Sequence, residues 1–244
     1  MNPVIEIENL DFSYNNDINV LENINIEVSE KDFVGIIGPN GGGKTTLLKL
    51  MLGLLKPVKG SIKVLGTTPQ KTTNKIGYVP QYNTTDKLFP INALDVVLMG
   101  LADSNSFLPW FSKKQLDRAD EVMELVHIQD LRKKTFGELS GGQKQRCLIA
   151  RAIASSPGIL FLDEPTASVD SKVESNIYEL LKELNKEVTI VLVSHDLGFV
   201  STYVNKVACV NKKLAFHKTA DINSQEINKI YNAEMSMIQH QCGL

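Results

Sequence analysis

A glycine-rich stretch early in the chain has the residue types and spacing of a phosphate-binding loop. It reads Gly38-Pro39-Asn40-Gly41-Gly42-Gly43-Lys44-Thr45 and fits the pattern G-x-x-x-x-G-K-[ST]. An apolar run at 33–37, typical of a buried strand, precedes it, and a helical pattern follows. Glycines let backbone N–H groups curl around phosphate oxygens, and the helix start adds partial positive charge. The ammonium of Lys44 can reach the β- and γ-phosphates, and the hydroxyl of Thr45 can ligate Mg²⁺.

Two adjacent carboxylates end a second apolar run, which reads ILFLDE. Asp163 stands where it can hold Mg²⁺ through water, and Glu164 where it can orient and deprotonate an attacking water. Taken alone, this pair could be a solvated strand end. Beside a phosphate-binding loop, the catalytic interpretation is favoured.

A second glycine-containing motif begins another predicted helix. Residues 139–143 read LSGGQ and are followed by the helical pattern KQRCLIARAIASSP. Two glycines directly before a long helix leave its first N–H groups open to an anion. One nucleotide needs only one such cradle. The second therefore suggests a nucleotide held by another copy of the chain.

The apolar pattern of the chain predicts an α/β core. Continuous apolar runs at 33–37, 158–162 and 189–194 favour strands buried on both faces, as in a parallel sheet covered by helices. Helical patterns follow these runs at 44–55, 171–185 and about 197–203. This alternation of strand, turn and helix is typical of an α/β fold.

Other parts of the chain depart from this alternation. Near the start, VIEIENL and NINIEV alternate apolar and polar residues, as half-solvated strands do. The segment from about 81 to 140 reads as loop and helix and is interpreted as an inserted helical lobe. VACVN and KLAFH predict a late hairpin, and residues 220–244 predict a polar helix and a tail.

The composition suits one globular unit that can bury a full core. The 244 residues are 43% hydrophobic, and 26 Lys and Arg face 28 Asp and Glu, for a formal net charge of −2. No general electrostatic attraction to nucleic acid is expected. The cysteines Cys147, Cys209 and Cys242 lie too far apart for a disulfide framework or a zinc ribbon. The N-terminus lacks a signal-peptide pattern, and no apolar run approaches the roughly 18 residues of a membrane span.

Taken together, the motifs over residues 5–217 resemble those of the nucleotide-binding subunits of ABC (ATP-binding cassette) transporters. The resemblance assigns the adenine-stacking aromatic to Tyr14 in LDFSY, the Q-loop glutamine to Gln81 in GYVPQ and the switch histidine to His195 in VSHD. The D-loop, ASVD, ends at Asp170, and LSGGQ is the family's signature. Tyr14, Gln81 and His195 are weak signals when taken singly, so the resemblance depends on the order of the motifs and their spacing to the phosphate-binding loop.

The resemblance implies a P-loop NTPase fold with a RecA-like parallel sheet, an N-terminal antiparallel β subdomain and an inserted helical lobe. It divides the chain into an ATPase domain at 1–219 and a C-terminal helix and tail at 220–244. Within the domain, the core covers 1–81 and 150–219, and the lobe covers about 82–149.

The resemblance also implies ATP and Mg²⁺ as cofactors and assigns a role to each motif residue. The catalytic residues are Lys44, Gln81, Glu164 and His195; the ATP-binding residues are Tyr14, Gly38, Pro39, Asn40, Gly41, Gly42, Gly43, Lys44, Thr45 and Thr46. Mg²⁺ is assigned to Thr45, Gln81 and Asp163; the residues that act in trans are Ser140, Gly141, Gly142, Gln143 and Asp170. In trans means in a head-to-tail homodimer, where each ATP lies between the P-loop of one copy and LSGGQ of the other.

A family member without its own membrane span requires separate membrane-spanning subunits. In the family, the region of FPINALDVVLMG at 89–100 meets those subunits, and SFLPWF at 106–111 offers further apolar docking residues. For Leu94, Val97 and Leu98 the lobe core is an equal alternative, and Trp110 is the better docking candidate. The expected location is the cytoplasmic face of the bacterial plasma membrane.

Several stretches are similar to the zinc, manganese and iron importer ATPases of bacteria, among them SHDLGFVSTYVNKVACVNKKLAFH and EPTASVD. This similarity favours zinc, then manganese or iron, and implies an extracellular or periplasmic metal-binding protein as an indirect partner. His240 and Cys242 in the tail could form a regulatory metal site, although two ligands do not close a tetrahedral one; the alternative is a disordered polar end.

The sequence leaves three other functions to compare with this one. The first is a transport ATPase for another substrate class, such as an amino acid, siderophore or lipoprotein system. The second is a soluble ABC ATPase of DNA repair or translation, which usually carries two cassettes, long coiled-coil insertions or a basic linker. The third, a P-loop kinase or GTPase, does not account for LSGGQ, and the sequence lacks the guanine-reading N-K-x-D.

Overall fold

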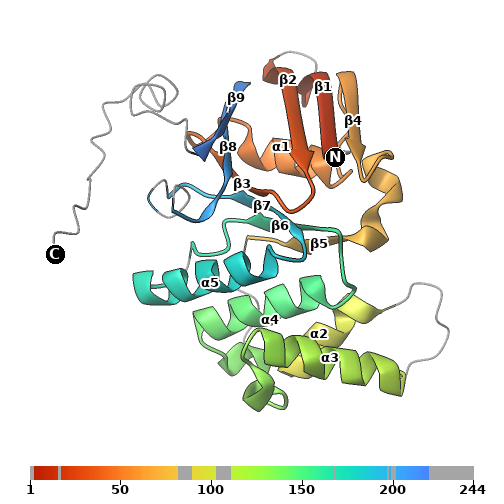
Figure 1. Ribbon diagram of the computed structural model, residues 1–244, viewed down its shortest axis with the longest axis vertical. Coiled ribbons are helices and arrows are strands. Elements are labelled where there is room, and N and C mark those ends of the chain that lie inside the picture. Colours follow the sequence, from red (N-terminus) through yellow and green to blue (C-terminus); the bar gives the residue numbers. More distant parts are fainter. Residues whose placement is uncertain are drawn as a thin grey trace.

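The computed structural model describes residues 3–15, 18–81, 90–102, 111–167, 169–196, 198 and 202–219. Its centre is a six-stranded sheet in the order β5-β6-β7-β3-β8-β9 (Figure 1). The strands are β3 (Phe33–Ile37), β5 (Ile76–Val79), β6 (Ile159–Asp163), β7 (Thr189–Val193), β8 (Lys206–Asn211) and β9 (Lys213–Lys218). The first five run parallel, and β9 pairs antiparallel with β8 as the predicted hairpin.

Alternate residues of the central strands enter two separate hydrophobic cores. In β6, Ile159 and Phe161 face one core while Leu160 and Leu162 face the other, and all four are fully buried. β3 and β7 are likewise buried along their whole length. The continuous apolar runs of the sequence thus reflect a sheet covered on both faces.

A three-stranded antiparallel sheet and α1 (Lys44–Met51) lie over one face of the central sheet. The strands are β1 (Pro3–Ser13), β2 (Asn19–Ser29) and β4 (Lys59–Val64), in the order β2-β1-β4. α1 contacts β4 on one side and β6 and β7 on the other. The helix that follows the phosphate-binding loop is therefore held between two sheets.

The other face is covered by α5 (Ser171–Leu184) and the helical lobe (Figure 1). The lobe contains α2 (Ala93–Leu98), α3 (Lys113–Leu125) and α4 (Gly141–Ile153), which contact one another. Five short 3-10 turns connect the described elements: η1 (Pro69–Lys71), η2 (Thr73–Lys75), η3 (Met99–Leu101), η4 (Gln129–Leu131) and η5 (Phe136–Glu138). Of the docking candidates, Val97 and Leu98 are buried in the lobe core, and Leu94 packs against it.

The predicted fold class is confirmed: a parallel core, an N-terminal antiparallel sheet and an inserted lobe. Two details differ. α1 ends at Met51 rather than residue 55, because Gly53 takes a left-handed φ of 74° that ends the helix. The predicted lobe boundary at about 149 falls inside α4, which continues to Ile153. The tail, Trp110, His240 and Cys242 lie outside the described residues.

Candidate active site

The phosphate-binding loop connects β3 to α1 in a conformation that its glycines make possible. Gly38, Gly41 and Gly43 have positive φ angles of 151°, 78° and 103°. The loop also packs tightly on β8: a Cβ on Gly38 would lie 2.0 Å from the carbonyl oxygen of Val210. Lys212 N–H donates to the Gly42 carbonyl over 3.1 Å. Glycine is needed here both for backbone shape and for close approach.

Lys44 is buried against the loop that precedes it. Its Nζ donates to the carbonyls of Gly38 at 2.9 Å and Pro39 at 3.1 Å, and the residue is 6% exposed. Burial lowers the pKa of Lys44, and the negative charges of Glu164 and Asp163 oppose that shift. The ammonium is thus a desolvated donor whose charge gains from anionic partners.

Tyr14, the predicted adenine-stacking aromatic, lies beside the first turn of α1. Its hydroxyl and Oγ1 of Thr46 are 3.1 Å apart, and its ring contacts Phe12 edge-on. The side chain remains 58% exposed, so its ring is open to a stacking partner. Thr45, in contrast to the buried Thr46, faces solvent at the start of the helix.

Asp163, the last residue of β6, is a buried carboxylate at 5% exposure. Burial raises the pKa of Asp163, and neighbouring Glu164 raises it further, while Lys49 and Lys44 act in the opposite direction. A divalent cation would relieve both unfavourable effects. Lys49, on α1, was not singled out in the sequence, because nothing in its spacing relates it to Asp163.

Glu164, Gln81 and His195 converge although they lie far apart in the sequence. Gln81 Nε2 donates to Glu164 Oε2 over 2.8 Å, and His195 Nδ1 lies 3.9 Å from the same oxygen. Glu164 has a left-handed φ of 46°, and its N–H donates to the Val193 carbonyl over 3.0 Å. Parallel neighbours β5, β6 and β7 end at one edge of the sheet and so bring these three residues together.

The LSGGQ motif forms a local structure of its own at the start of α4. Ser140 and Gln143 form a capping box: the serine side chain accepts from Gln143 N–H, and Ser140 N–H donates to Gln143 Oε1 over 3.0 Å. Asp170 caps α5 in a similar way by accepting from Val173 N–H at 3.1 Å. The S-x-x-Q spacing could have predicted the first cap.

The buried Gly142 allows α4 to approach α5. A Cβ at this position would lie 2.4 Å from Cγ1 of Val173. The described hydrogen bonds of Ser140, Gly141, Gln143 and Asp170 are all local, and none reaches the phosphate-binding loop of the same chain. Thus the structure gathers Lys44, Asp163, Glu164, Gln81 and His195 and leaves the signature apart.

These residues fit a magnesium-bound nucleotide. The positive φ angles of Gly38, Gly41 and Gly43 are typical of loops that bind anions through backbone N–H groups, and the desolvated Lys44 contacts this loop. Thr45 and Asp163 offer oxygen donors, which Mg²⁺ prefers. The fold and this site define a P-loop nucleotide-hydrolysing protein.

Comparison with known proteins narrows this class. The family model described as ABC transporter matches residues 21–167, more than half of the chain. A zinc uptake system ATP-binding protein, ZurA of Listeria innocua, is 42% identical over 225 residues, 90% of this chain and 87% of the relative. The manganese transport system ATP-binding protein MntB of Halalkalibacterium halodurans is 38% identical over 242 residues, 97% of this chain and 95% of the relative.

A solved structure similar to this chain also comes from an ABC transporter described as of the metal-chelate type. It is an inward-facing putative metal-chelate type ABC transporter, with a TM-score of 0.84 and 32% identity over 94% of this chain and 89% of the matched chain. The chain belongs to the ABC transporter family, and it is an ATPase of the ATP-binding cassette type. Within the described ranges, no helix combines the length and apolar character needed to cross a bilayer.

Proposed function

We propose that this chain is the ATP-hydrolysing subunit that powers import of a divalent metal ion through a membrane ABC transporter, with zinc favoured and manganese or iron next. The observation that carries the hydrolytic role is the convergence of Gln81 and His195 on the carboxylate of Glu164, next to the phosphate-binding loop. The names of the zinc and manganese relatives support metal as the substrate.

In this proposal, bound Mg²⁺·ATP supplies the phosphoanhydride to be cleaved and a cation that neutralises its charge. Lys44 exchanges the carbonyls of Gly38 and Pro39 for phosphate oxygens, while Thr45 and Asp163, with Gln81, hold the metal. Glu164 takes a proton from the attacking water.

Three further positions complete the site in this proposal. Gln81 holds the carboxylate of Glu164 in place. His195 stabilises the charge that develops on the transferred phosphoryl group. Tyr14 stacks on the adenine, for which its exposed ring is suited.

The proposed working form is a head-to-tail homodimer that closes on ATP. Each copy would add Ser140, Gly141, Gly142, Gln143 and Asp170 to the nucleotide of the other. Because the signature makes no described hydrogen bond to its own phosphate-binding loop, its helix start remains available to a second copy. Its N–H groups and the serine hydroxyl then supply the charge stabilisation that other P-loop enzymes obtain from an arginine.

A groove between the lobe and the central sheet is the proposed docking site for the membrane subunits. It has a volume of about 770 Å³, and its lining includes Tyr78, Met99, Gly100 and Arg151. Met99 belongs to the predicted docking stretch at 89–100 and is 52% exposed. Bound in this way, the chain would lie peripherally on the cytoplasmic face of the bacterial plasma membrane. The extracellular or periplasmic metal-binding protein would interact only with the membrane subunits.

Metal uptake by cells that lack this chain tests the proposal. Uptake of zinc, manganese and iron is measured separately at low external metal, after complementation with wild type or with Glu164→Gln. We expect wild type alone to restore one metal, and zinc is the predicted one. Restoration of manganese instead would change the substrate, and normal uptake of all three in the deleted strain would refute metal import.

The purified Glu164→Gln variant tests the hydrolytic mechanism. It keeps the shape and size of the side chain but removes the base, so we expect ATP binding to persist and hydrolysis to fall about 100- to 10,000-fold. Size measurement with and without Mg²⁺·ATP should show a dimer only with nucleotide. A variant that remains monomeric with Mg²⁺·ATP would argue against the trans arrangement.

A further inference from the structure

One buried amide stands out because it has no partner inside the chain. Gln145, in the second turn of α4, is 4% exposed. Among the described residues, its Nε2 is the only buried side-chain nitrogen or oxygen without a hydrogen-bond partner. Such groups are rare in folded proteins because burying an unpaired donor is unfavourable, and each one calls for an explanation.

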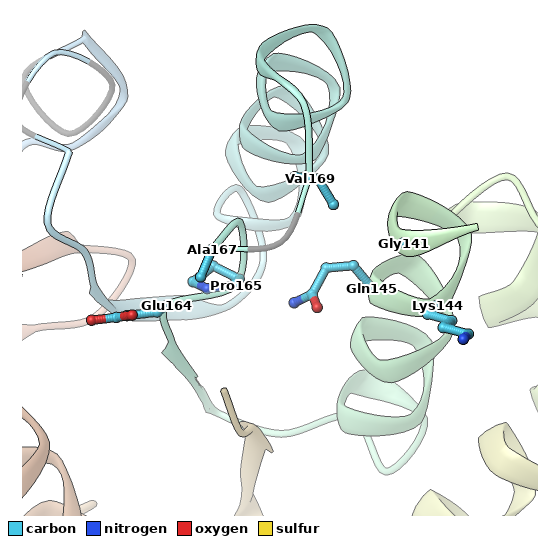
Figure 2. A pocket seen from close by; sticks show the side chains of 7 residues that line it. All are labelled: Gly141, Lys144, Gln145, Glu164, Pro165, Ala167 and Val169. Atoms are coloured by element: carbon cyan, nitrogen blue, oxygen red, sulfur yellow. The ribbon is translucent and has the colours of Figure 1, made fainter. Parts of the chain in front are cut away.

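The amide borders a cavity of about 160 Å³ between α4 and the segment that follows β6. One wall is formed by Gly141, Lys144 and Gln145, and the other by Glu164, Pro165, Ala167 and Val169. Figure 2 shows the Gln145 side chain extending from α4 across this space toward Pro165 and Ala167. The cavity thus separates the signature helix from the turn that begins at Glu164.

The opposite wall of the cavity is a backbone turn that begins at Glu164 and includes Pro165. The turn is held by bonds from Ala167 N–H to the Glu164 carbonyl and from Val169 N–H to the Thr166 carbonyl, each 3.3 Å long. An unpaired amide donor and the backbone of this turn, which contains the Pro165 carbonyl, therefore border one small cavity.

Both walls are connected to parts of the proposed mechanism. The cap residue Ser140 lies five positions before Gln145 on the same helix, and Gly142 fixes that helix end against α5. Pro165 directly follows Glu164, whose left-handed backbone needs support from its surroundings. A bond across the cavity would connect the contact with the partner's nucleotide to the catalytic base of the chain's own site.

We propose that Gln145 is a positioning residue whose amide nitrogen donates to the Pro165 carbonyl when two copies close on ATP, so that closure at the signature fixes the turn carrying Glu164. This inference depends on the proposed roles of Ser140 and Glu164. In the state described here the bond is unmade, so the amide contributes to the closed state rather than to the stability of the resting fold.

Gln145→Met tests this role because methionine keeps the length and apolar volume of the side chain and removes the donor. We expect kcat for ATP hydrolysis to fall about tenfold, the equivalent of one hydrogen bond of ~1.4 kcal/mol. The KM for ATP should change less than about twofold, and the Hill coefficient should fall toward one because the two sites lose a connection. The Tm of the nucleotide-free chain should not fall.

Gln115→Met is the matched control in the same lobe. Gln115 lies in α3, and its Nε2 already donates to the Leu101 carbonyl over 2.9 Å. Loss of this hydrogen bond should lower Tm and leave kcat unchanged. Gln145→Asn keeps a shorter amide and should recover part of the lost kcat and cooperativity.

The outcomes separate the inference from the function on which it depends. A Gln145→Met variant with lower Tm and wild-type kcat would overturn the inference, since the amide would then act only in the fold. Full hydrolysis by Glu164→Gln, measured in parallel, would instead overturn the role of Glu164.

Discussion

The starts of α1 and α4 are both glycine-rich helix N-termini, yet they are built differently. α1 has no side-chain cap, and Gly41 and Gly43 before it adopt positive φ angles. α4 is closed by the capping box of Ser140 and Gln143, and its glycines are helical. Free N–H groups at α1 suit permanent occupation by a nucleotide, whereas a ligand at α4 must compete with the helix's own cap. The comparison explains why only one of the two would bind ATP without a partner.

The largest effect should come from removing the cation at α1. Lys44→Met deletes charge-assisted hydrogen bonds of about 1.5–3 kcal/mol, so ATP affinity should fall roughly 10- to 100-fold. Titration with a fluorescent ATP analogue measures this change. Affinity within twofold of wild type would mean that the free N–H groups alone hold the nucleotide.

At α4, Ser140→Ala should separate capping from catalysis. Loss of the cap costs about 1 kcal/mol of folding free energy, and loss of the hydroxyl in trans should lower hydrolysis about tenfold or more. Ser112→Ala is the matched control because Ser112 and Gln115 form an identical capping box on α3. Denaturant unfolding and ATPase rates are measured for both variants. Equal ATPase rates in the two variants would show that the signature serine acts only as a helix cap.

Alanine at one glycine of each N-terminus should destabilise for different reasons. The Cβ that Gly41→Ala adds would have no atom within 4 Å, but alanine in this left-handed backbone conformation is strained by roughly 1–2 kcal/mol. Gly142→Ala overpacks against Val173 at a cost of about 1–3 kcal/mol, which Val173→Ala should largely relieve. A double-mutant cycle measures the rescue, and its absence would place the strain in the backbone of α4 instead.

The smallest expected effect concerns the buried charge next to α1. Because burial raises the pKa of Asp163, its ionised form opposes folding, and this penalty grows as pH rises through that pKa. Asp163→Asn should therefore unfold at a higher Tm than wild type at pH 7 without Mg²⁺. The difference in Tm between the two proteins should disappear near pH 4. A lower Tm at pH 7 would show that the carboxylate is paired in the resting state.

Sequence alone predicted most of the strands of the central core. β3 was predicted residue for residue, and β6 and β7 to within one, because strands buried on both faces are apolar throughout. β4 was missed because, of KGSIKV, only Ile62 and Val64 are buried. The Gly142–Val173 contact and the unpaired amide of Gln145 depend on helix packing, which no local pattern encodes.

The late hairpin of β8 and β9 has a consequence for how this protein is made. Val210 packs on Gly38, and Lys212 donates to Gly42 and accepts from Glu22 N–H. The phosphate-binding loop therefore depends on residues that follow it by some 170 positions. During synthesis the loop cannot make its supporting contacts until Val210 and Lys212 have been added, because these contacts are non-local. Nascent chains still on the ribosome would lack a finished nucleotide cradle, so ATP would bind only to completed cassettes.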